Sequence, residues 1–373
     1  MTSPSTFGSA LEWRSATRIL AVRLDSIGDV VMTTPALAAL HDAPGRPSVT
    51  LLTSPAGAAL APLLPMVDAV IAHRAPWVSG ACFDDDDALI ERLRARRFDA
   101  AVIFTVSTQS ALPASLVCRM AGIPLRLAHS RENPYGLLTH WVRDEDRLGD
   151  AMRHEVRRQL DLVASVGFSA ASERLQIDIG ASDARAAAAA LVAHGLAERQ
   201  PYFVVHVGAN AASRRYAPER FGRAAREVGA RTGWRAVFTG SDDEAELVAR
   251  ALAHAGGDAV AITRDLALGT LAALIGGARL LIANNSAPMH LAAALGTPVV
   301  ALYALTNPQH TPWRVPAAVL HRHVDCRHCL KSTCPRADHA CLNGVAVEQV
   351  VDAAMNLAMR PRRASAAVAL PSP

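Results

Sequence analysis

Aromatic residues are scarce in this chain of 373 residues: Phe, Trp and Tyr together make up 5% of it, and charged residues 19%. Ala, Leu and Val carry most of the 51% hydrophobic content, a profile typical of helices packed on parallel sheets. Long apolar runs are lacking too. No stretch reaches the roughly 18 apolar residues of a membrane span, and residues 1–17 contain no apolar core of a signal peptide. We therefore expect a cytoplasmic protein.

A concentrated basic region is also missing. The formal charge of +4 comes from 38 basic and 34 acidic residues, and the arginines are scattered along the chain. A nucleic-acid-binding protein usually carries a focused basic stripe, so this distribution argues against nucleic acid as a partner. A mildly basic surface favours anionic substrates or a peripheral contact with anionic lipid. Residues 361–373, rich in Pro, Ala, Ser and Arg, are predicted to be a disordered tail.

Short apolar runs alternate with helical patterns in both halves of the chain, which predicts an α/β fold with parallel sheets. We expect two Rossmann-like domains, at 18–190 and 200–355, facing each other across a cleft, with a boundary in the Ala-rich helix 181–199. Ligands of such sheets bind at the carboxyl ends of the strands. The predicted strands are Ile19–Leu24, Val49–Thr53, Ala69–Ala72, Ala100–Thr105, Tyr202–Val207, Arg235–Thr239, Ala259–Ile262, Arg279–Ala283 and Pro298–Tyr303.

The turn after the first predicted strand lacks the glycines of common nucleotide motifs. Gly28 stands alone in Asp25-Ser26-Ile27-Gly28-Asp29, so neither the three-glycine dinucleotide fingerprint nor a Gly-Lys-Ser/Thr phosphate loop is present. This counts against NAD chemistry and ATP hydrolysis. In one interpretation Gly28 lets a substrate approach and Asp29 acts as a general base. In the other, Asp29 only caps the following helix.

A second turn, Asn285-Ser286-Ala287-Pro288-Met289-His290, joins a predicted strand to a predicted helix that ends at Gly296. Ser286 is a suitable N-cap, and Pro288 fits the first helical turn. Free backbone N–H groups and the helix dipole make such a turn an anion site, best suited to phosphate. The alternative is a plain capping serine and a packed core histidine at 290.

Two arginines follow the first strand of the second half. The strand ends at Gly208, a polar loop carries Arg214 and Arg215, and a helix is predicted to start at Pro218. Paired guanidinium groups beside a helix start can hold a pyrophosphate through bidentate hydrogen bonds. The alternative is a solvated basic loop.

Four of the six cysteines lie within 16 residues, as C-x2-C-x4-C-x6-C. Four thiolates can close a tetrahedral zinc or iron site, which would be structural because it leaves no open position. His323, His328 and His339 are alternative ligands, and reduced thiols or two disulfides are the alternative states. The cysteines of the motif are Cys326, Cys329, Cys334 and Cys341. The acidic run Asp84–Asp87, by contrast, precedes a helical pattern and is interpreted as first-turn acids, not as a metal motif.

These segments resemble glycosyltransferase family 9, the ADP-heptose:lipopolysaccharide heptosyltransferases. The resemblance covers about residues 18–355. Its strongest parts are ILAVRLDSIGDVVMTTPALAAL (19–40), residues 205–221 and SAPMHLAAALGTPVVALY (286–303). It implies a glycosyltransferase B type fold, an N-terminal acceptor domain, a C-terminal nucleotide-sugar domain, and transfer with inversion that needs no catalytic metal.

The resemblance also implies roles for individual residues. Asp29 would be the general base, and Arg214, or Arg215 if the loop register shifts, would hold the donor pyrophosphate. The family's Asp-Ser/Thr-Gly-x-x-His turn here has Asn285 and Ala287 in place of Asp and Gly. The site residues predicted in this way are the catalytic Asp29; on the donor side Gly208, Arg214, Arg215, Asn285, Ser286, Ala287 and His290; and on the acceptor side Gly28, Thr105, Gln109 and Arg131.

The expected partners are an ADP-sugar donor and a lipopolysaccharide core acceptor, with a peripheral contact at the inner face of the inner membrane. Three alternatives stay open. The acceptor could be a protein or another glycan. The chain could be a weakly active or non-catalytic sugar-nucleotide binder, which the changes at 285 and 287 would suit. The cysteines alone would fit a metal-dependent redox protein.

Overall fold

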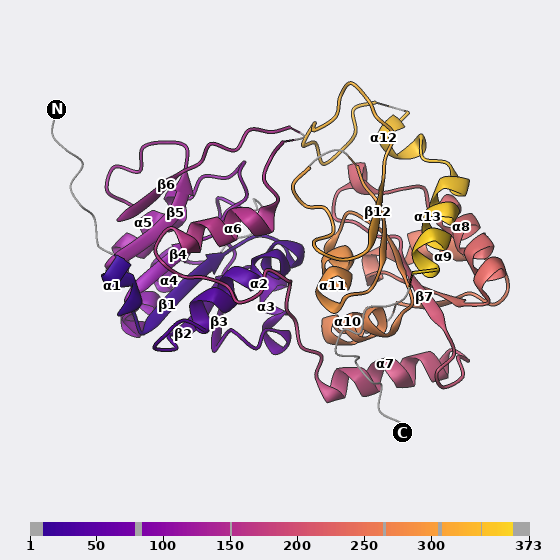
Figure 1. The fold of residues 1–373 in the computed structure, drawn as a ribbon, viewed down its shortest axis with the longest axis horizontal. Helices are drawn as coiled ribbons and strands as arrows, with labels where there is room; N and C mark the ends of the chain where they lie inside the picture. Colours follow the sequence, from indigo (N-terminus) through magenta and orange to yellow (C-terminus); the bar gives the residue numbers. More distant parts are fainter. Residues whose placement is uncertain are drawn as a thin grey trace. The chain divides into compact units, whose positions relative to one another are not determined.

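Two six-stranded sheets, in which every strand pairing is parallel, form the framework of this computed structural model (Figure 1). The chain divides into a first unit, residues 1–147 with 151–176, and a second unit, residues 148–150 with 177–373. The predicted tail, 361–373, lies outside the residues that the structure describes. The described residues are 10–78, 84–149, 151–263, 266–304, 308–336 and 338–360.

The sheet of the first unit has the strand order β3-β2-β1-β4-β5-β6, the order of a Rossmann fold. Its central strands are buried on both faces, which is why they read as unbroken apolar runs in the sequence. The strands are β1 (Arg18–Arg23), β2 (Ser48–Thr53), β3 (Ala69–Ala72), β4 (Ala100–Ile103), β5 (Leu125–Ser130) and β6 (His140–Arg143).

Helices cover both faces of this sheet. On one face α2 packs against α6, and on the other α4 and α5 pack together over an apolar cluster that includes Val22, Leu24 and Ile103. Helix α4 begins after Asp85, whose carboxylate accepts hydrogen bonds from the N–H groups of Asp87 (2.9 Å) and Ala88 (3.2 Å). Asp86 and Asp87 lie in the first turn of α4, as predicted, and Asp85 additionally caps the helix. The helices are α1 (Ala10–Arg14), α2 (Ile27–His41), α3 (Pro55–Ala58), η1 (Ala61–Leu63), α4 (Asp86–Arg96), α5 (Leu112–Met120) and α6 (Glu155–Ala164).

The second unit repeats the same topology, since the order β9-β8-β7-β10-β11-β12 is again that of a Rossmann fold. Its strands are β7 (Tyr202–His206), β8 (Arg235–Thr239), β9 (Val260–Ile262), β10 (Leu281–Asn284), β11 (Val299–Leu302) and β12 (Ala317–Leu320). Its helices are α7 (Ala181–Ala193), η2 (Ala212–Arg214), α8 (Pro218–Thr232), η3 (Asp242–Glu244), α9 (Ala245–Leu252), α10 (Leu268–Gly277), α11 (Ala287–Leu295), α12 (Ala340–Asn343) and α13 (Val347–Ala358).

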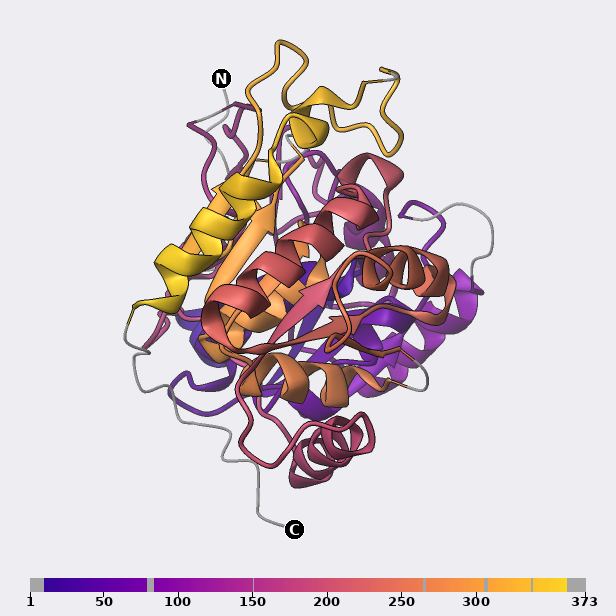
Figure 2. The same ribbon diagram turned by 90° about the vertical axis from the view of Figure 1, so that its right-hand side faces the viewer.

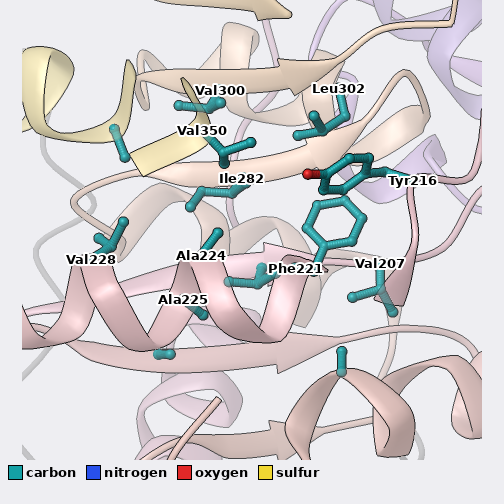
Figure 3. Close-up of a cluster of buried hydrophobic side chains, with 14 of the residues drawn as sticks. Val207, Tyr216, Phe221, Ala224, Ala225, Val228, Ile282, Val300, Leu302 and Val350 are labelled. Carbon is teal, nitrogen blue, oxygen red and sulfur yellow. The ribbon is translucent and has the colours of Figure 1, made fainter. Parts of the chain in front are cut away.

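Helices α8 and α13 lie side by side over one face of this second sheet (Figure 2). The core beneath them is apolar, and the rings of Tyr216 and Phe221 meet edge to face there at 5.2 Å (Figure 3). The Tyr216 hydroxyl donates a hydrogen bond to the Val345 carbonyl (3.0 Å), so its polar end is satisfied inside the core. Helix α8 reaches α9 closely at Gly222, where a Cβ would lie 2.1 Å from the Ala251 carbonyl oxygen.

The division of the chain falls at Gln176 and Ile177, ahead of the Ala-rich helix in which the sequence placed it. Helix α7 belongs to the second unit because it packs on α10. A Cβ at Gly269 would come within 2.4 Å of the Asp183 carboxylate, which shows how closely the two helices approach.

Candidate functional site

Each sheet reverses its direction of growth at one point, between β1 and β4 in the first unit and between β7 and β10 in the second. Ligands of open parallel sheets bind at the carboxyl ends of the strands at such switch points. Most of the predicted site residues follow the carboxyl ends of these four strands. The two sites are described separately, starting with the first unit.

A buried arginine organises the first site. Arg23 is the last residue of β1 and is 0% exposed. Its guanidinium forms ion pairs with Asp25 (3.1 Å), Asp29 (3.2 Å) and Glu155 (2.9 Å). Burial works to lower the pKa of Arg23, yet the three carboxylates hold it above its ordinary value. Three carboxylates around one cation leave the cluster with excess negative charge, which favours proton uptake by one of them.

Asp29 has two roles in this structure at once. It lies in the first turn of α2, where its Oδ2 accepts hydrogen bonds from the Ser26 N–H (3.1 Å) and hydroxyl (2.7 Å). Its Oδ1 faces Arg23, and its side chain remains 13% exposed. The capping interpretation is therefore correct but incomplete, because the same carboxylate belongs to the charged cluster. Gly28, beside it, is buried in the same turn.

The predicted acceptor-side residues Thr105 and Gln109 lie in the loop after β4 and join this cluster. Gln109 Nε2 donates a 2.6 Å hydrogen bond to Asp25 Oδ1, and the Thr105 carbonyl accepts one from Gln159 Nε2 (3.0 Å). Burial raises the pKa of Asp25, although Arg23 works to lower it.

Arg131 lies in a neighbouring network. It is half-exposed and pairs with Asp144 at 3.5 Å, and Asp144 also pairs with the buried Arg158 at 3.0 Å. Arg158 in turn donates a hydrogen bond to the Thr105 carbonyl. The structure thus connects Arg131 to the loop after β4 through two intermediates, and the prediction that it contacts the acceptor stays a prediction.

In the second unit, Asn284 ties the donor-side loops together. It ends β10 and is fully buried. Its Oδ1 accepts a hydrogen bond from the Tyr216 N–H (3.0 Å), and its Nδ2 donates one to the Val207 carbonyl (2.8 Å). Asn284 therefore fixes both ends of the loop that carries Arg214 and Arg215 beside the start of α11.

The turn at 285–290 starts a helix as predicted, with one difference. Ser286 occupies the N-cap position, but its hydroxyl bonds the Asn284 carbonyl (3.4 Å) and does not cap the helix. The predicted capping bond is therefore wrong. Ala287 has a negative φ as the first residue of α11, so its methyl group does not strain the turn. The helix ends at Gly296, which adopts a φ of 73°.

Two polar side chains of this turn are buried. Asn285 is 5% exposed, and within the described part of the chain its Oδ1 has no hydrogen-bond partner. A buried, unsatisfied acceptor is costly, so a ligand donor or water is expected there. The His290 ring, also buried, meets His310 edge to face at 6.4 Å.

The two arginines of the loop differ in their contacts. Arg215 Nε donates a hydrogen bond to the Ala209 carbonyl (2.8 Å). Arg214 Nε is buried and unsatisfied by any residue that the structure describes. Of these two arginines, Arg214 is therefore the one whose Nε–H lacks an acceptor. A buried donor without an acceptor is expected where an anion binds.

Gly208 lies against the carboxylate of Glu244, a residue that was not predicted from the sequence. A Cβ at this position would lie 2.0 Å from the Glu244 carboxylate. Glu244 Oε2 accepts a hydrogen bond from the Ser241 N–H (3.0 Å) and lies 3.7 Å from His206 Nε2. Burial lowers the pKa of His206, although Glu244 works to raise it, so the neutral ring is favoured.

The profile of glycosyltransferase family 9 (heptosyltransferase) matches residues 87–339, more than half of the chain. The chain belongs to glycosyltransferase family 9. This confirms the resemblance seen in the sequence, and membership makes the protein a glycosyltransferase.

Relatives of this family 9 enzyme support the same assignment. Lipopolysaccharide heptosyltransferase 2 of Escherichia coli K12 is 28% identical over 232 residues, which cover 59% of this chain and 64% of that protein. The chain thus matches less than two thirds of the length of its curated relatives.

Solved structures show the fold of the family 9 enzyme. A family 9 glycosyltransferase from Veillonella parvula superposes with a TM-score of 0.77 at 24% identity, covering 92% of this chain and 97% of that one. The ADP-heptose lipopolysaccharide heptosyltransferase II of E. coli gives 0.71 at 20% identity, covering 92% and 98%. The predicted glycosyltransferase B type fold is confirmed.

The four-cysteine segment of this family 9 enzyme is hydrogen-bonded to the loop that carries Arg214 and Arg215. Ser213 precedes Arg214 and is buried. Its N–H donates to the Ser332 carbonyl (3.0 Å), its hydroxyl donates to the Lys331 carbonyl (2.6 Å), and its own carbonyl is 2.8 Å from His339 Nε2. The segment therefore positions the loop that carries Arg214.

The thiols themselves are not gathered around one point. Cys326 and Cys329 are exposed, and Cys334 and Cys341 are partly exposed. Among the residues that the structure describes, no group of three or more His, Cys, Asp or Glu side chains is arranged to hold a metal. The donor set, four thiols within 16 residues, still has the chemistry of a tetrahedral metal site.

Four residues that matter to the two sites of this family 9 enzyme were not predicted from its sequence. Arg23 and Glu155 were visible only as single charges at the end of an apolar strand and at the start of a helix. Asn284 lies just beyond the strand predicted at Arg279–Ala283, and Glu244 belongs to no motif that the sequence singles out. No described helix of the enzyme is both long and apolar enough to span a membrane.

Proposed function

We propose that this enzyme moves a heptose from ADP-heptose to a sugar of the lipopolysaccharide core, with inversion at the transferred carbon. The observation that carries the proposal is Asp29, a partly exposed carboxylate held at the β1 switch point by Arg23 and Ser26. A protein that only binds sugar nucleotides needs no such base, so the cluster favours an active transferase. The related proteins that are named for heptose transfer to lipopolysaccharide support the choice of substrates.

The second unit would bind the donor. The start of α11 offers backbone N–H groups and the positive end of its dipole to the pyrophosphate. Arg214 would add a charge-assisted hydrogen bond, with Arg215 beside it. Glu244 follows the second strand of this unit, where a carboxylate typically accepts hydrogen bonds from ribose hydroxyls. The buried side chains of Asn285 and His290 would also belong to the donor site. Gly208 has no side chain, so it leaves space for the Glu244 carboxylate.

The first unit would bind the acceptor and supply the base. Asp29 would remove the proton of an acceptor hydroxyl as that oxygen forms a bond to C1 of the heptose. The bond from C1 to the phosphate oxygen breaks, and its electron pair leaves on ADP. Attack from the side opposite to ADP inverts the anomeric centre. Cations at the donor site would stabilise the charge that develops on the departing ADP.

The proposed acceptor is anchored in lipid, so we expect the enzyme to work in the cytoplasm at the inner face of the inner membrane, in peripheral contact with it. A different acceptor, a protein or another glycan, would use the same chemistry. The test is to incubate the purified enzyme with ADP-heptose and a panel of truncated core oligosaccharides, and to follow the mass of each acceptor. One acceptor should gain one heptose residue. If every acceptor keeps its mass while a protein or another glycan gains the sugar, the lipopolysaccharide assignment is wrong.

Arg214→Ala should weaken ADP binding by roughly tenfold or more, because a charge-assisted hydrogen bond contributes about 1.5–3 kcal/mol. Isothermal titration with ADP measures this directly. Arg220→Ala is the matched control, since Arg220 donates to the Asn343 (2.6 Å) and Val345 (3.1 Å) carbonyls and should leave ADP affinity unchanged. Unchanged affinity in Arg214→Ala together with a loss in Arg215→Ala would transfer the role to Arg215.

We also propose that the four cysteines hold one structural zinc or iron ion, and that catalysis itself needs no metal. Elemental analysis should find about one ion per chain, and the double variant Cys326→Ser/Cys329→Ser should lose it. Cys118→Ala removes a thiol from helix α5 of the first unit and should keep the metal. Metal-free wild-type protein with four free thiols, or with two disulfides by mass, would contradict the site. Transfer that persists without the metal would exclude the redox alternative, and transfer that stops when the metal alone is removed and the fold is kept would contradict metal-independent catalysis.

A further inference from the structure

A pocket of about 280 Å³ opens in the first unit at the carboxyl ends of β1 and β4. It lies on the face of the sheet that α4 and α5 cover, close to the lower limit of the roughly 300–1,000 Å³ found for small-ligand sites. Its floor is apolar, from Val22, Leu24, Ile103 and Phe104, and Pro113 and Ala114 of α5 close one side.

One wall of the pocket is aromatic. Trp77 lines it and is partly exposed, although it packs against the apolar cluster beneath α4. Aromatic residues make up only 5% of the chain, so a partly exposed tryptophan at a switch point is unusual in this protein. The indole offers a flat apolar face and a polar N–H, which suits a ligand that has an apolar face and hydroxyl groups.

The polar side of the pocket contains an unsatisfied hydroxyl. Thr105 is 8% exposed, and no residue in the described part of the chain bonds its Oγ1. Buried polar groups are nearly always hydrogen-bonded, so an orphaned hydroxyl that lines a cavity indicates a missing ligand group or water. Asp25, which also lines the pocket, is held by Gln109 at 2.6 Å.

The charge of the pocket excludes anions. Asp25 is a carboxylate, and the described residues that line the pocket include no Lys or Arg. Arg23, which pairs with Asp25, is fully buried and already shared by three carboxylates. A phosphate or carboxylate group in this pocket would therefore meet uncompensated repulsion.

We propose that this pocket binds an uncharged sugar ring of the acceptor, with the C–H face of the ring on Trp77 and its hydroxyls on Thr105 and Asp25. The inference rests on the proposed function. Arg23 links the pocket to the base, since its Nε faces Asp25 and its terminal nitrogen faces Asp29. A ring seated at Asp25 would therefore lie against a carboxylate that shares its guanidinium with the proposed base. The acceptor end that this enzyme recognises is an unphosphorylated, uncharged pyranose.

Saturation-transfer NMR with the full chain tests the pocket without the donor. The probes are the methyl α-pyranosides of glucose, galactose and mannose, and glucose 6-phosphate as the charged counterpart. At least one neutral glycoside should receive saturation on its ring C–H protons, and its dissociation constant should be about tenfold lower than that of the phosphate. Trp77→Ala should raise that constant about tenfold, and Thr105→Val about three- to tenfold.

Thr53→Val is the matched control. Thr53 ends the neighbouring strand β2 with a buried hydroxyl that also lacks a bonding partner among the described residues, but it does not line the pocket. Its replacement should leave sugar binding unchanged. The inference is overturned if the phosphate binds as tightly as the neutral glycosides, or if Thr53→Val and Thr105→Val have equal effects. It is also overturned if no neutral glycoside binds.

The same preparation separates this inference from the proposed function. If ADP binds and heptose is transferred while neutral glycosides bind equally to wild type, Trp77→Ala and Thr105→Val, only the pocket assignment fails. If the glycosides bind in the pocket as expected but ADP does not bind the chain, the donor assignment fails and the pocket stands.

Discussion

Asp29→Asn should reduce the rate of heptose transfer by about 10²–10⁴ while leaving the affinity for ADP within twofold. The amide keeps the shape of the side chain and can still accept the hydrogen bonds from Ser26, but it cannot take up the proton of the acceptor hydroxyl. ADP binding is expected to persist because the donor residues belong to the other unit. Initial rates at saturating donor, together with calorimetric titration of ADP, measure the two quantities separately.

Asp85→Asn provides the matched control for this variant. Asp85 is also a carboxylate at the start of a helix of the first unit, where it caps α4 through two backbone N–H groups. Its replacement removes the same charge from a similar position but should leave transfer unchanged. If Asp29→Asn turned over like wild type, or if both variants slowed equally, the carboxylate would be a cap and not the base.

Arg23→Met should lower the free energy of unfolding by about 3–5 kcal/mol, because removing one partner of a buried ion pair leaves uncompensated charges in the interior. The effect should be unusually large here, since the same guanidinium serves three carboxylates. Urea unfolding of the full chain, followed by tryptophan fluorescence, measures the loss. Arg18→Met changes an exposed arginine at the other end of the same strand and should shift stability by no more than about 0.5 kcal/mol.

The stability lost in Arg23→Met should also depend on pH, in a direction that the buried carboxylates determine. Without Arg23, the pKa values of the buried carboxyls rise above those of the unfolded chain, so the folded state binds more protons than the unfolded state. Stability of the variant therefore increases relative to wild type as the pH falls from 8 towards about 5, where these carboxyls become protonated. A deficit that stays constant over this range would mean that Arg23 contributes packing and not charge compensation.

The sequence predicted the turns of the site well because their signals are local. The Asp25–Asp29 turn, the Gly208 turn and the start of α11 all lie within a few residues of the strand that precedes them. The buried strands β1, β2 and β7 were found for the same reason, as continuous apolar runs. Asp29 could be singled out from its turn alone, but its ion pair could not, because Glu155, which completes the Arg23 cluster, is 132 positions away from Arg23.

Three strands were missed, each for a physical reason. In β5, Arg126 and His129 interrupt the apolar run, and inside the unit both lie within hydrogen-bond distance of backbone carbonyls. Arg126 Nε donates to Leu137 (2.6 Å), and His129 Nε2 is 3.1 Å from the Arg158 carbonyl. The two edge strands are less buried than the central ones. Strand β6 carries His140 and Arg143 and alternates partly buried with exposed positions, and β12, although apolar, is only four residues long and partly buried. The predicted capping bond of Ser286 does not form, and its hydroxyl instead lies 3.4 Å from the Asn284 carbonyl.

The anomeric configuration of the product tests the central claim most directly. The wild-type enzyme is incubated with ADP-heptose, the accepted core oligosaccharide and a metal chelator, and the new linkage is examined by NMR. A metal-independent attack by an oxygen that Asp29 deprotonates predicts undiminished product whose anomeric configuration is opposite to that of the donor. A product that retains the donor configuration, or transfer that stops with the chelator while the fold persists, would contradict the account.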